Sequence, residues 1–458
     1  MLNAPSQIPA ASVSKAPALT KNQRFYALFV FSLAVLIYFI VNIQRVAIPG
    51  QIFNELQSDL RISATAVATL GATFMYVYAA TQLLVGLLVD KYGGMRVMFC
   101  GSILMSIGSI LFPLSRSLSA LMLSRMLVGL GCGAAYLSIV KESDRLFSHN
   151  FTQVMGLVIS LGYFGGVLGT LPLAKTVGWI GWRPTLMLIA LVTAITTAII
   201  ALIWRRCPKP EPMEDKISLK PYLHGFRIRT NLINMSSYAV NFAIYYVILT
   251  VFGRKFLEDI AGLSPDAASF SCTMMVVLSA LLNQFIGVLC GYTGNLRQPY
   301  YRTLNLFPLI ACSMLVFGLL CKGNAPGWGG FFVTAFIIIS LTSGFSPITN
   351  ALARETNPPN RTGVAVGIAN FAAYIMVALL GSVSGLVLDL FKGKAIETAG
   401  RLIYPDAAYL CLYSLFFVIS IFTFRISLAY PETAGRNIYA GRIRMQQLTR
   451  FIKLKLYE

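Results

Sequence analysis

The first long apolar stretch of the chain, YFIVNIQRVAIPGQIF from Tyr38 to Phe53, contains Asn42, Gln44 and Arg45. An arginine in apolar surroundings is costly unless it faces water or a polar partner. Its planar guanidinium can donate two parallel hydrogen bonds to a carboxylate or a phosphate. The stretch therefore predicts an anion-binding group within a membrane helix. The alternative is that the side chain snorkels to the outer lipid headgroups.

Residues that could support enzyme chemistry or bind a metal are sparse. The eight cysteines form no CxxC pair, and both histidines, His149 and His224, lie in polar segments. We find no nucleophile with a nearby base and no phosphate-binding loop, so we expect no enzyme, no cofactor and no metal. Acidic residues are absent from the centres of the apolar runs. A proton, the candidate coupling ion, therefore has no evident carrier.

The composition indicates a membrane protein. Of the 458 residues, 56% are hydrophobic and only 12% are charged, whereas soluble domains carry about 25% charged residues. Apolar runs of about 20 residues can each cross the hydrocarbon core of a bilayer. Such runs fall at residues 25–48, 65–89, 97–115, 118–141, 153–174, 184–204, 231–253, 266–290, 303–321, 329–351, 364–388 and 406–429. They predict an all-α integral membrane protein with about twelve transmembrane helices.

The chain has a net charge of +20, and its basic residues are distributed along the sequence in a way that indicates membrane topology. This distribution argues against a nucleic-acid partner. Counted from a cytoplasmic N-terminus, 25 Lys and Arg residues lie on that side of the membrane and 10 on the other. This asymmetry follows the positive-inside rule. We expect both termini in the cytoplasm, insertion in a bacterial plasma (inner) membrane, and contact of the basic segments with anionic headgroups of the bilayer.

The longest polar interruption, residues 205–229, lies near the middle of the chain and is rich in proline and charge. It predicts a linker between two six-helix halves. The expected organisation is a disordered cytoplasmic segment 1–24, a bundle 25–204, a linker 205–230, a bundle 231–429 and a basic tail 430–458. The halves look duplicated, because GLLVDKYGGMR at 86–96 aligns without a gap with GVLCGYTGNLR at 287–297. Such repeats, related by an axis normal to the membrane, are a transporter architecture.

The first of these segments resembles the signature loop of the major facilitator superfamily, which joins spans 2 and 3. The residues that match the family pattern are Gly86, Asp90, Lys91, Gly93 and Arg96. The resemblance implies the two-repeat fold of that family and a gate at the cytoplasmic face. Asp90 would accept charge-assisted bonds from Arg96 or from a helix N-terminus, and Arg297 is the equivalent of Arg96 in the second half. The alternative is a solvated basic turn.

The resemblance continues in span 4, where Arg125 is followed by Gly129, Gly131 and Gly133. It implies close helix packing at these glycines. For Arg125 it implies a structural role, with proton coupling as the alternative.

The stretch around Arg45 resembles the organic-anion:cation symporter branch of this family, in which Asp-Arg is common; here Gln44 replaces the acidic residue. Organophosphate antiporters of this branch carry a second arginine in the seventh helix, where this chain has Tyr245 and Tyr246. The helices that line the family's cavity supply the other candidate residues, which are Tyr38, Asn42, Tyr76, Tyr136, Lys141, Tyr163, Asn241, Gln284, Asn350, Asn370 and Tyr374. The alternative for each is an interhelical hydrogen bond.

These features together predict a monomeric secondary active transporter that works by alternating access. We expect a small organic anion as its solute, and a carboxylate or amino-acid-like compound fits better than an organophosphate. The Gly-rich span 5 and the aromatic candidates leave a multidrug or metabolite exporter as a second hypothesis. A third, of another class, is a solute-sensing membrane receptor without transport, which a flux measurement in proteoliposomes would distinguish.

Overall fold

The computed structural model describes residues 20–147, 151–203, 220–322, 327–358, 362–398 and 401–438. The elements of the first part are α1 (Lys21–Ala47), η1 (Gly50–Ile52), α2 (Phe53–Leu60), α3 (Ala64–Tyr92), α4 (Gly94–Leu114), α5 (Leu118–Leu146), α6 (Phe151–Leu168), α7 (Leu171–Ile180) and α8 (Trp182–Ile203). The second part contains α9 (Lys220–Phe226), α10 (Arg229–Ser236), α11 (Tyr238–Val247), η4 (Ile248–Phe252), α12 (Gly253–Asp259), α13 (Pro265–Tyr292), α14 (Gln298–Cys321), α15 (Gly329–Gly344), α16 (Pro347–Thr356), α17 (Thr362–Asp389), η6 (Lys392–Lys394), β1 (Ile396–Thr398), β2 (Arg401–Ile403) and α18 (Asp406–Ser427).

The prediction of an all-α membrane protein is confirmed. Twelve helical segments of the described chain are long and apolar enough to cross a bilayer. Several begin at a side-chain cap, because Ser63, Ser117 and Ser264 each accept a hydrogen bond from a backbone N–H in the first turn of α3, α5 and α13. The short antiparallel hairpin of β1 and β2, in which Ile396 pairs with Ile403, was not predicted.

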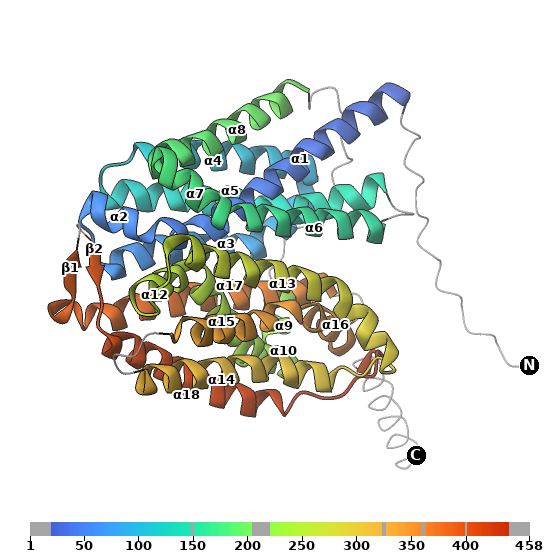
Figure 1. Ribbon diagram of the computed structural model, residues 1–458. Helices are drawn as coiled ribbons and strands as arrows, with labels where there is room; N and C mark the ends of the chain where they lie inside the picture. Colours follow the sequence, from blue (N-terminus) through green and yellow to red (C-terminus); the bar gives the residue numbers. More distant parts are fainter. Residues whose placement is uncertain are drawn as a thin grey trace, which may run out of the picture.

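The helices lie roughly alongside one another, so the bundle has two ends (Figure 1). We call the end with the start of α1 and the ends of α8 and α18 the termini end. The opposite end, with α2, α12 and the β1–β2 hairpin, is the distal end (Figure 1). Helices α1 to α8 fill one side of this view and α9 to α18 the other, and α3 packs against α17 across the boundary.

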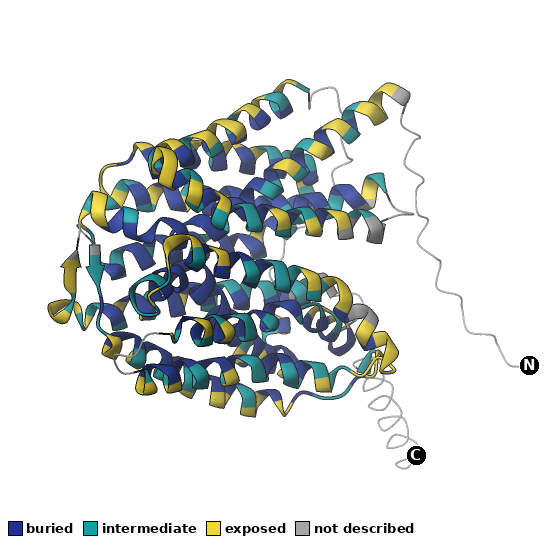
Figure 2. Cartoon of the chain, viewed as in Figure 1, coloured by how far each residue is buried: buried dark blue, intermediate teal, exposed yellow. Residues whose placement is uncertain are grey.

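Burial follows the pattern expected of helices in lipid. Exposed residues follow the outer faces of the bundle, whereas buried residues face neighbouring helices (Figure 2). The outer faces carry large apolar side chains, among them Leu157, Trp179, Leu188 and Leu202. Such a surface is stable against hydrocarbon and unstable against water, which agrees with the membrane prediction.

The seventh span differs from its predicted range of 231–253, because it continues to Asp259 through the π-helical turn η4 and the helix α12. The extension carries four charged residues, which hydropathy alone placed in a loop. They are buried because they pair with one another along one helix face, Arg254 with Glu258 and Lys255 with Asp259. The tenth span is also irregular, since it breaks between Gly344 and Pro347.

Candidate functional site

A cavity of about 340 Å³ lies between the two sets of helices. Helices α1, α3, α5, α6, α11, α13, α16 and α17 all contribute to its wall. Toward the distal end its lining residues Val46, Leu249 and Val276 are buried, whereas Asn350, on the termini side, is exposed. The cavity is therefore closed at the distal end and reaches solvent at the termini end. Eight tyrosines line it, namely Tyr38, Tyr78, Tyr136, Tyr163, Tyr238, Tyr245, Tyr246 and Tyr374.

Arg45 lies in the cavity wall, in the last turn of α1. Its Nη1 donates to the hydroxyl of Tyr374 on α17 at 3.0 Å, and its Nη2 donates to Oδ1 of Asn42. The rings of Tyr78, Tyr246 and Tyr374 surround the guanidinium, with 5.7–6.0 Å between Cζ and each ring centroid. These aromatic faces stabilise a cation without neutralising its charge.

Within the described part of the chain, the cavity wall places no carboxylate beside Arg45. Among the lining residues that the structure describes, Arg45 is the only charged one. Its Nε and the hydroxyl of Tyr246 are both buried and have no hydrogen-bond partner in the described residues. Buried polar atoms without partners are costly, so this pair of donors is suited to an anionic oxygen of a bound molecule.

The predicted binding residues divide into two groups. Those that line the cavity are Tyr38, Asn42, Arg45, Tyr136, Tyr163, Tyr245, Asn350, Asn370 and Tyr374. The others, Tyr76, Lys141, Asn241 and Gln284, are not part of its lining. Asn241 is fully buried and donates to Asn305 at 2.8 Å, and Gln284 donates to Ser160 at 3.1 Å. These two residues therefore make the interhelical bonds that were the alternative reading.

Sequence reasoning missed several lining residues, including Tyr78, Gln82, Tyr238 and Asn283. Tyr78 and Gln82 lie one turn apart on α3, the helix that also carries the predicted candidate Tyr76. The i, i+4 spacing of two polar or amphipathic residues within an apolar run was the available signal.

Arg125 is almost completely buried and is not part of the lining of the cavity that contains Arg45. It donates to the carbonyl oxygen of Ile48, just after α1, at 3.2 Å, and its Cζ lies 4.4 Å from the ring centroid of Phe74. The glycines that follow allow close helix approach. A Cβ on Gly129 or Gly133 would lie within 3.0 Å of atoms of α3, and one on Gly131 within 3.0 Å of atoms of α4.

The signature loop forms a tight turn at the termini end. Gly93 has a φ of +84°, which favours glycine, and it joins α3 directly to α4. The Nζ of Lys91 lies 5.4 Å from the ring centroid of Tyr92. Arg96 is half-buried, and Gly86 faces the hydroxyl of Tyr222 on α9. The side chain of Asp90 lies outside the described residues, so its expected bonds are not tested.

Glu142 of α5 occupies the place that was expected for an acidic partner of a helix N-terminus. Its carboxylate accepts from the backbone N–H of Met95 at the start of α4 at 3.2 Å and from Nε of Arg145 at 2.7 Å. A carboxylate at this position is stabilised by the helix dipole and by the free N–H groups of the first turn.

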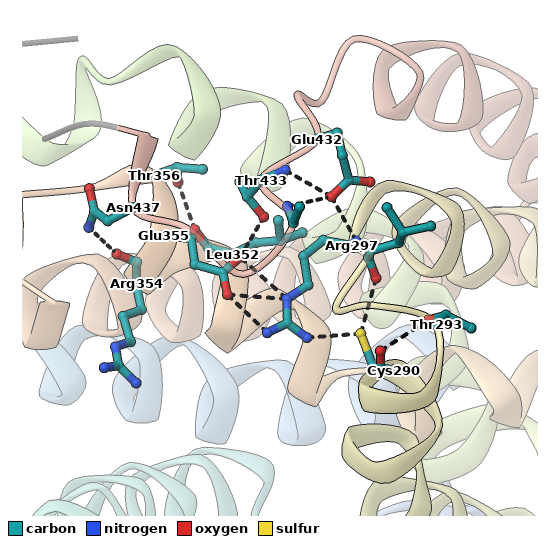
Figure 3. A network of polar contacts seen from close by, with 12 residues as sticks. Cys290, Thr293, Arg297, Leu352, Arg354, Glu355, Thr356, Glu432, Thr433 and Asn437 are labelled. Carbon is teal, nitrogen blue, oxygen red and sulfur yellow. Dashed lines mark hydrogen bonds and ion pairs between the residues drawn. The ribbon is translucent and has the colours of Figure 1, made fainter. Parts of the chain in front are cut away.

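A similar arrangement recurs in the second half, around Arg297 (Figure 3). The Nη2 of Arg297 lies 3.0 Å from Oε1 of Glu355 at the end of α16, and its Nε donates to both carboxylate oxygens at 3.2 and 3.3 Å. The hydroxyl of Thr433 also donates to Glu355. Glu355 therefore links the end of α16 to the start of α14, in the same way that Glu142 links the end of α5 to the start of α4.

Glu432 satisfies the free N–H groups at the start of α14 (Figure 3). Partial burial by itself raises the pKa of the Glu432 carboxyl. The backbone N–H groups of Arg297, Ala434, Gln298 and Thr433 outweigh this and hold that pKa below its ordinary value.

We therefore expect Glu432 to make stability depend on pH. Because its folded-state pKa is lowered, the stabilisation is fully present above the unfolded pKa of about 4.3 and is lost as the pH falls below it. The melting temperature of the parent should fall between pH 6 and pH 3, in part because Glu432 becomes protonated. In Glu432→Gln that part of the fall should be absent. Glu397→Gln, at an exposed hairpin position, is the control. Equal acid sensitivity of the parent and Glu432→Gln would contradict the assignment.

Comparison with known proteins supplies the family. The model of the Major Facilitator Superfamily matches residues 30–381. The chain is 24% identical to a hexuronate transporter of Bacillus subtilis, over 83% of this chain and 92% of that protein. It is 23% identical to a probable sulfoacetate transporter of Cupriavidus necator, over 81% and 87% of the two chains. It is 21% identical to a choline/ethanolamine transporter of Danio rerio, over 80% and 79%.

These relatives carry small organic solutes of either charge sign, so their names alone do not give the charge of this chain's solute. The family match spans more than half of the sequence and agrees with the twelve spans and the signature loop. The chain belongs to the major facilitator superfamily and is a membrane transporter.

Proposed function

We propose that this transporter carries a small organic monoanion, with a carboxylate that binds Arg45. The observation that carries the proposal is the uncompensated charge of Arg45, the only charged group among the described lining residues of the cavity. A carboxylate there would accept hydrogen bonds from Nε of Arg45 and from the hydroxyl of Tyr246, which have no partner in the described residues. A single cation suits one negative charge better than a dianionic phosphate.

The remaining lining residues support a solute with a polar body. The amides of Asn283, Asn350 and Asn370 and the tyrosine hydroxyls offer donors and acceptors across the cavity from α1. Aromatic faces beside these groups can pack against the C–H surface of a ring. Hexuronates, the solutes in the name of one relative, combine one carboxylate with several hydroxyls and are the first probe to try.

Alternating access gives the transport mechanism that we propose. The cavity opens at the termini end, and the distal end must open in the other state while the solute stays between the two halves. The positive-inside distribution supports a cytoplasmic termini end. The coupling ion and its gradient set the direction of net transport.

Binding and flux of D-glucuronate test the proposal. Purified protein in nanodiscs should bind glucuronate and should bind neither glucose, which lacks the carboxylate, nor choline, which is cationic. Proteoliposomes should accumulate labelled glucuronate. Binding without flux would favour the solute-sensing receptor, and preferential binding of choline would overturn the anion assignment.

A further inference from the structure

A second, much smaller cavity lies beside Arg125, within the first set of helices. It has a volume of about 10 Å³, and residues of α1, α4, α5 and α8 form its wall together with Ile48. A space of this size suits one particle of about the size of a water molecule and is too small for an organic solute. The wall is apolar except at three side chains, which are those of Gln44, Ser109 and Arg125.

Arg125 brings a positive charge to this cavity that no acidic side chain balances. The residue is only 1% exposed, and a guanidinium keeps its charge in proteins. The titratable groups within electrostatic range in the described chain are the thiol of Cys132 and the hydroxyl of Tyr246, which are ordinarily neutral at pH 7. Its closest partners are the carbonyl oxygen of Ile48 and the ring of Phe74. Such neutral partners offset only part of the cost of burying a charge.

Hydrogen-bond donors remain open in the wall of this cavity. Nε and Nη1 of Arg125 are buried and have no partner in the described residues. Gln44 and Ser109 bond to each other, through Nε2 to Oγ at 2.8 Å and Oγ to Oε1 at 3.2 Å. An amide nitrogen carries two N–H groups, so the second one of Gln44 has no acceptor among the described residues. The polar part of the wall therefore offers donors and a positive charge, and this combination suits an anion.

We propose that this cavity binds one monatomic anion, which under physiological conditions is chloride. The ion accepts hydrogen bonds from Arg125 and from the amide of Gln44, and its charge balances that of the buried guanidinium. A water molecule would satisfy a donor but would leave the charge unbalanced. Arg125 also holds the carbonyl oxygen of Ile48, three residues after Arg45, so the ion stabilises the end of α1 that carries the arginine of the solute cavity. The site lies outside the solute cavity, and the inference does not depend on the proposed solute.

Thermal unfolding of the purified protein in nanodiscs tests the site in the absence of solute. Sodium chloride replaces sodium methanesulfonate, whose anion is too large for the cavity, at constant ionic strength. The melting temperature should rise by about 2–4 °C once chloride exceeds its Kd several-fold, and the rise should saturate as for a single site. Bromide should act as chloride does. A melting temperature that does not respond to chloride would overturn the proposal.

Two substitutions connect the chloride effect with the small cavity. Val128→Ile adds one methylene to the cavity wall and leaves Arg125 in place, so it should fill the space and abolish the effect. Val192→Ile makes the same change at an exposed position of α8 and should retain the effect. Arg125→Gln removes the charge and should abolish it as well. If Arg125→Gln does not fold, Val128→Ile decides the question, because a chloride effect of parental size in that variant would place the ion elsewhere.

The arginine of the solute cavity is the other group that could bind chloride, so the titration is repeated in Arg45→Ala. This variant should keep the full chloride effect. Loss of the effect in Arg45→Ala would assign the ion to the solute cavity and contradict the proposal. A crystal soaked in bromide gives the position directly, since the anomalous signal should lie within hydrogen-bond distance of Arg125. A water molecule there, with no bromide signal, would be incompatible with an anion site.

Discussion

Replacing Arg45 by alanine is expected to weaken glucuronate binding by about ten- to a hundredfold. A hydrogen bond to a charged group contributes about 1.5–3 kcal/mol, and each 1.4 kcal/mol corresponds to a tenfold change in Kd. The loss of affinity should be specific to anionic solutes, because Arg45 is the only charged group among the described lining residues. Isothermal titration of purified protein with glucuronate measures the effect.

Two further variants separate the role of Arg45 from general damage. Arg45→Lys should restore binding only in part, because an ammonium group lacks the planar fork that engages two carboxylate oxygens. Arg116→Ala removes an exposed arginine at the distal end and should bind glucuronate like the parent. If Arg45→Ala bound glucuronate as tightly as the parent, the carboxylate would have to bind elsewhere.

Replacing Arg297 by alanine is expected to lower the stability of the second half by about 3–5 kcal/mol. The variant leaves the carboxylate of Glu355 buried, with 8% of its side chain exposed, and removes its ion pair. The hydroxyl of Thr433 alone is a weak substitute for a guanidinium. The melting temperature of the purified protein in detergent measures this loss.

A double-mutant cycle shows whether the pair acts as a unit. Arg297→Met combined with Glu355→Leu removes both charges and fills similar volume, so it should be more stable than either single variant. Arg302→Met, on the first turns of α14, removes a positive charge that forms no ion pair with any residue that the structure describes, and it should cost less than Arg297→Met. Additive losses in the double variant would contradict a direct interaction.

Most of the fold could be predicted from the sequence because lipid imposes a local rule. Each span must satisfy its own backbone hydrogen bonds and present apolar side chains, so a run of about 20 apolar residues marks a helix whatever its neighbours are. The same rule failed at α12, where Arg254, Lys255, Glu258 and Asp259 lower the local hydropathy although the helix continues. Besides pairing with one another, they are held by residues about 200 positions earlier in the chain, since Asn54 donates to Glu258 and the carbonyl oxygen of Gln51 accepts from Arg254. A local window cannot include these contacts.

The sequence by itself determined the twelve spans, the family and the presence of an arginine in the first span. Only the tertiary structure decided what surrounds that arginine. Tyr374 was a candidate cavity residue, but nothing in a sequence window pairs it with Arg45, and its hydroxyl accepts a hydrogen bond from that side chain across 329 positions. It does so because the rotation of α17 about its axis and the packing of α3 against α17 direct Tyr78 and Tyr374 to the same side of the cavity. Hydropathy is nearly uniform around these helices, so it constrains their length but not their rotation, and the rotation follows from the shapes of side chains on several helices packed together.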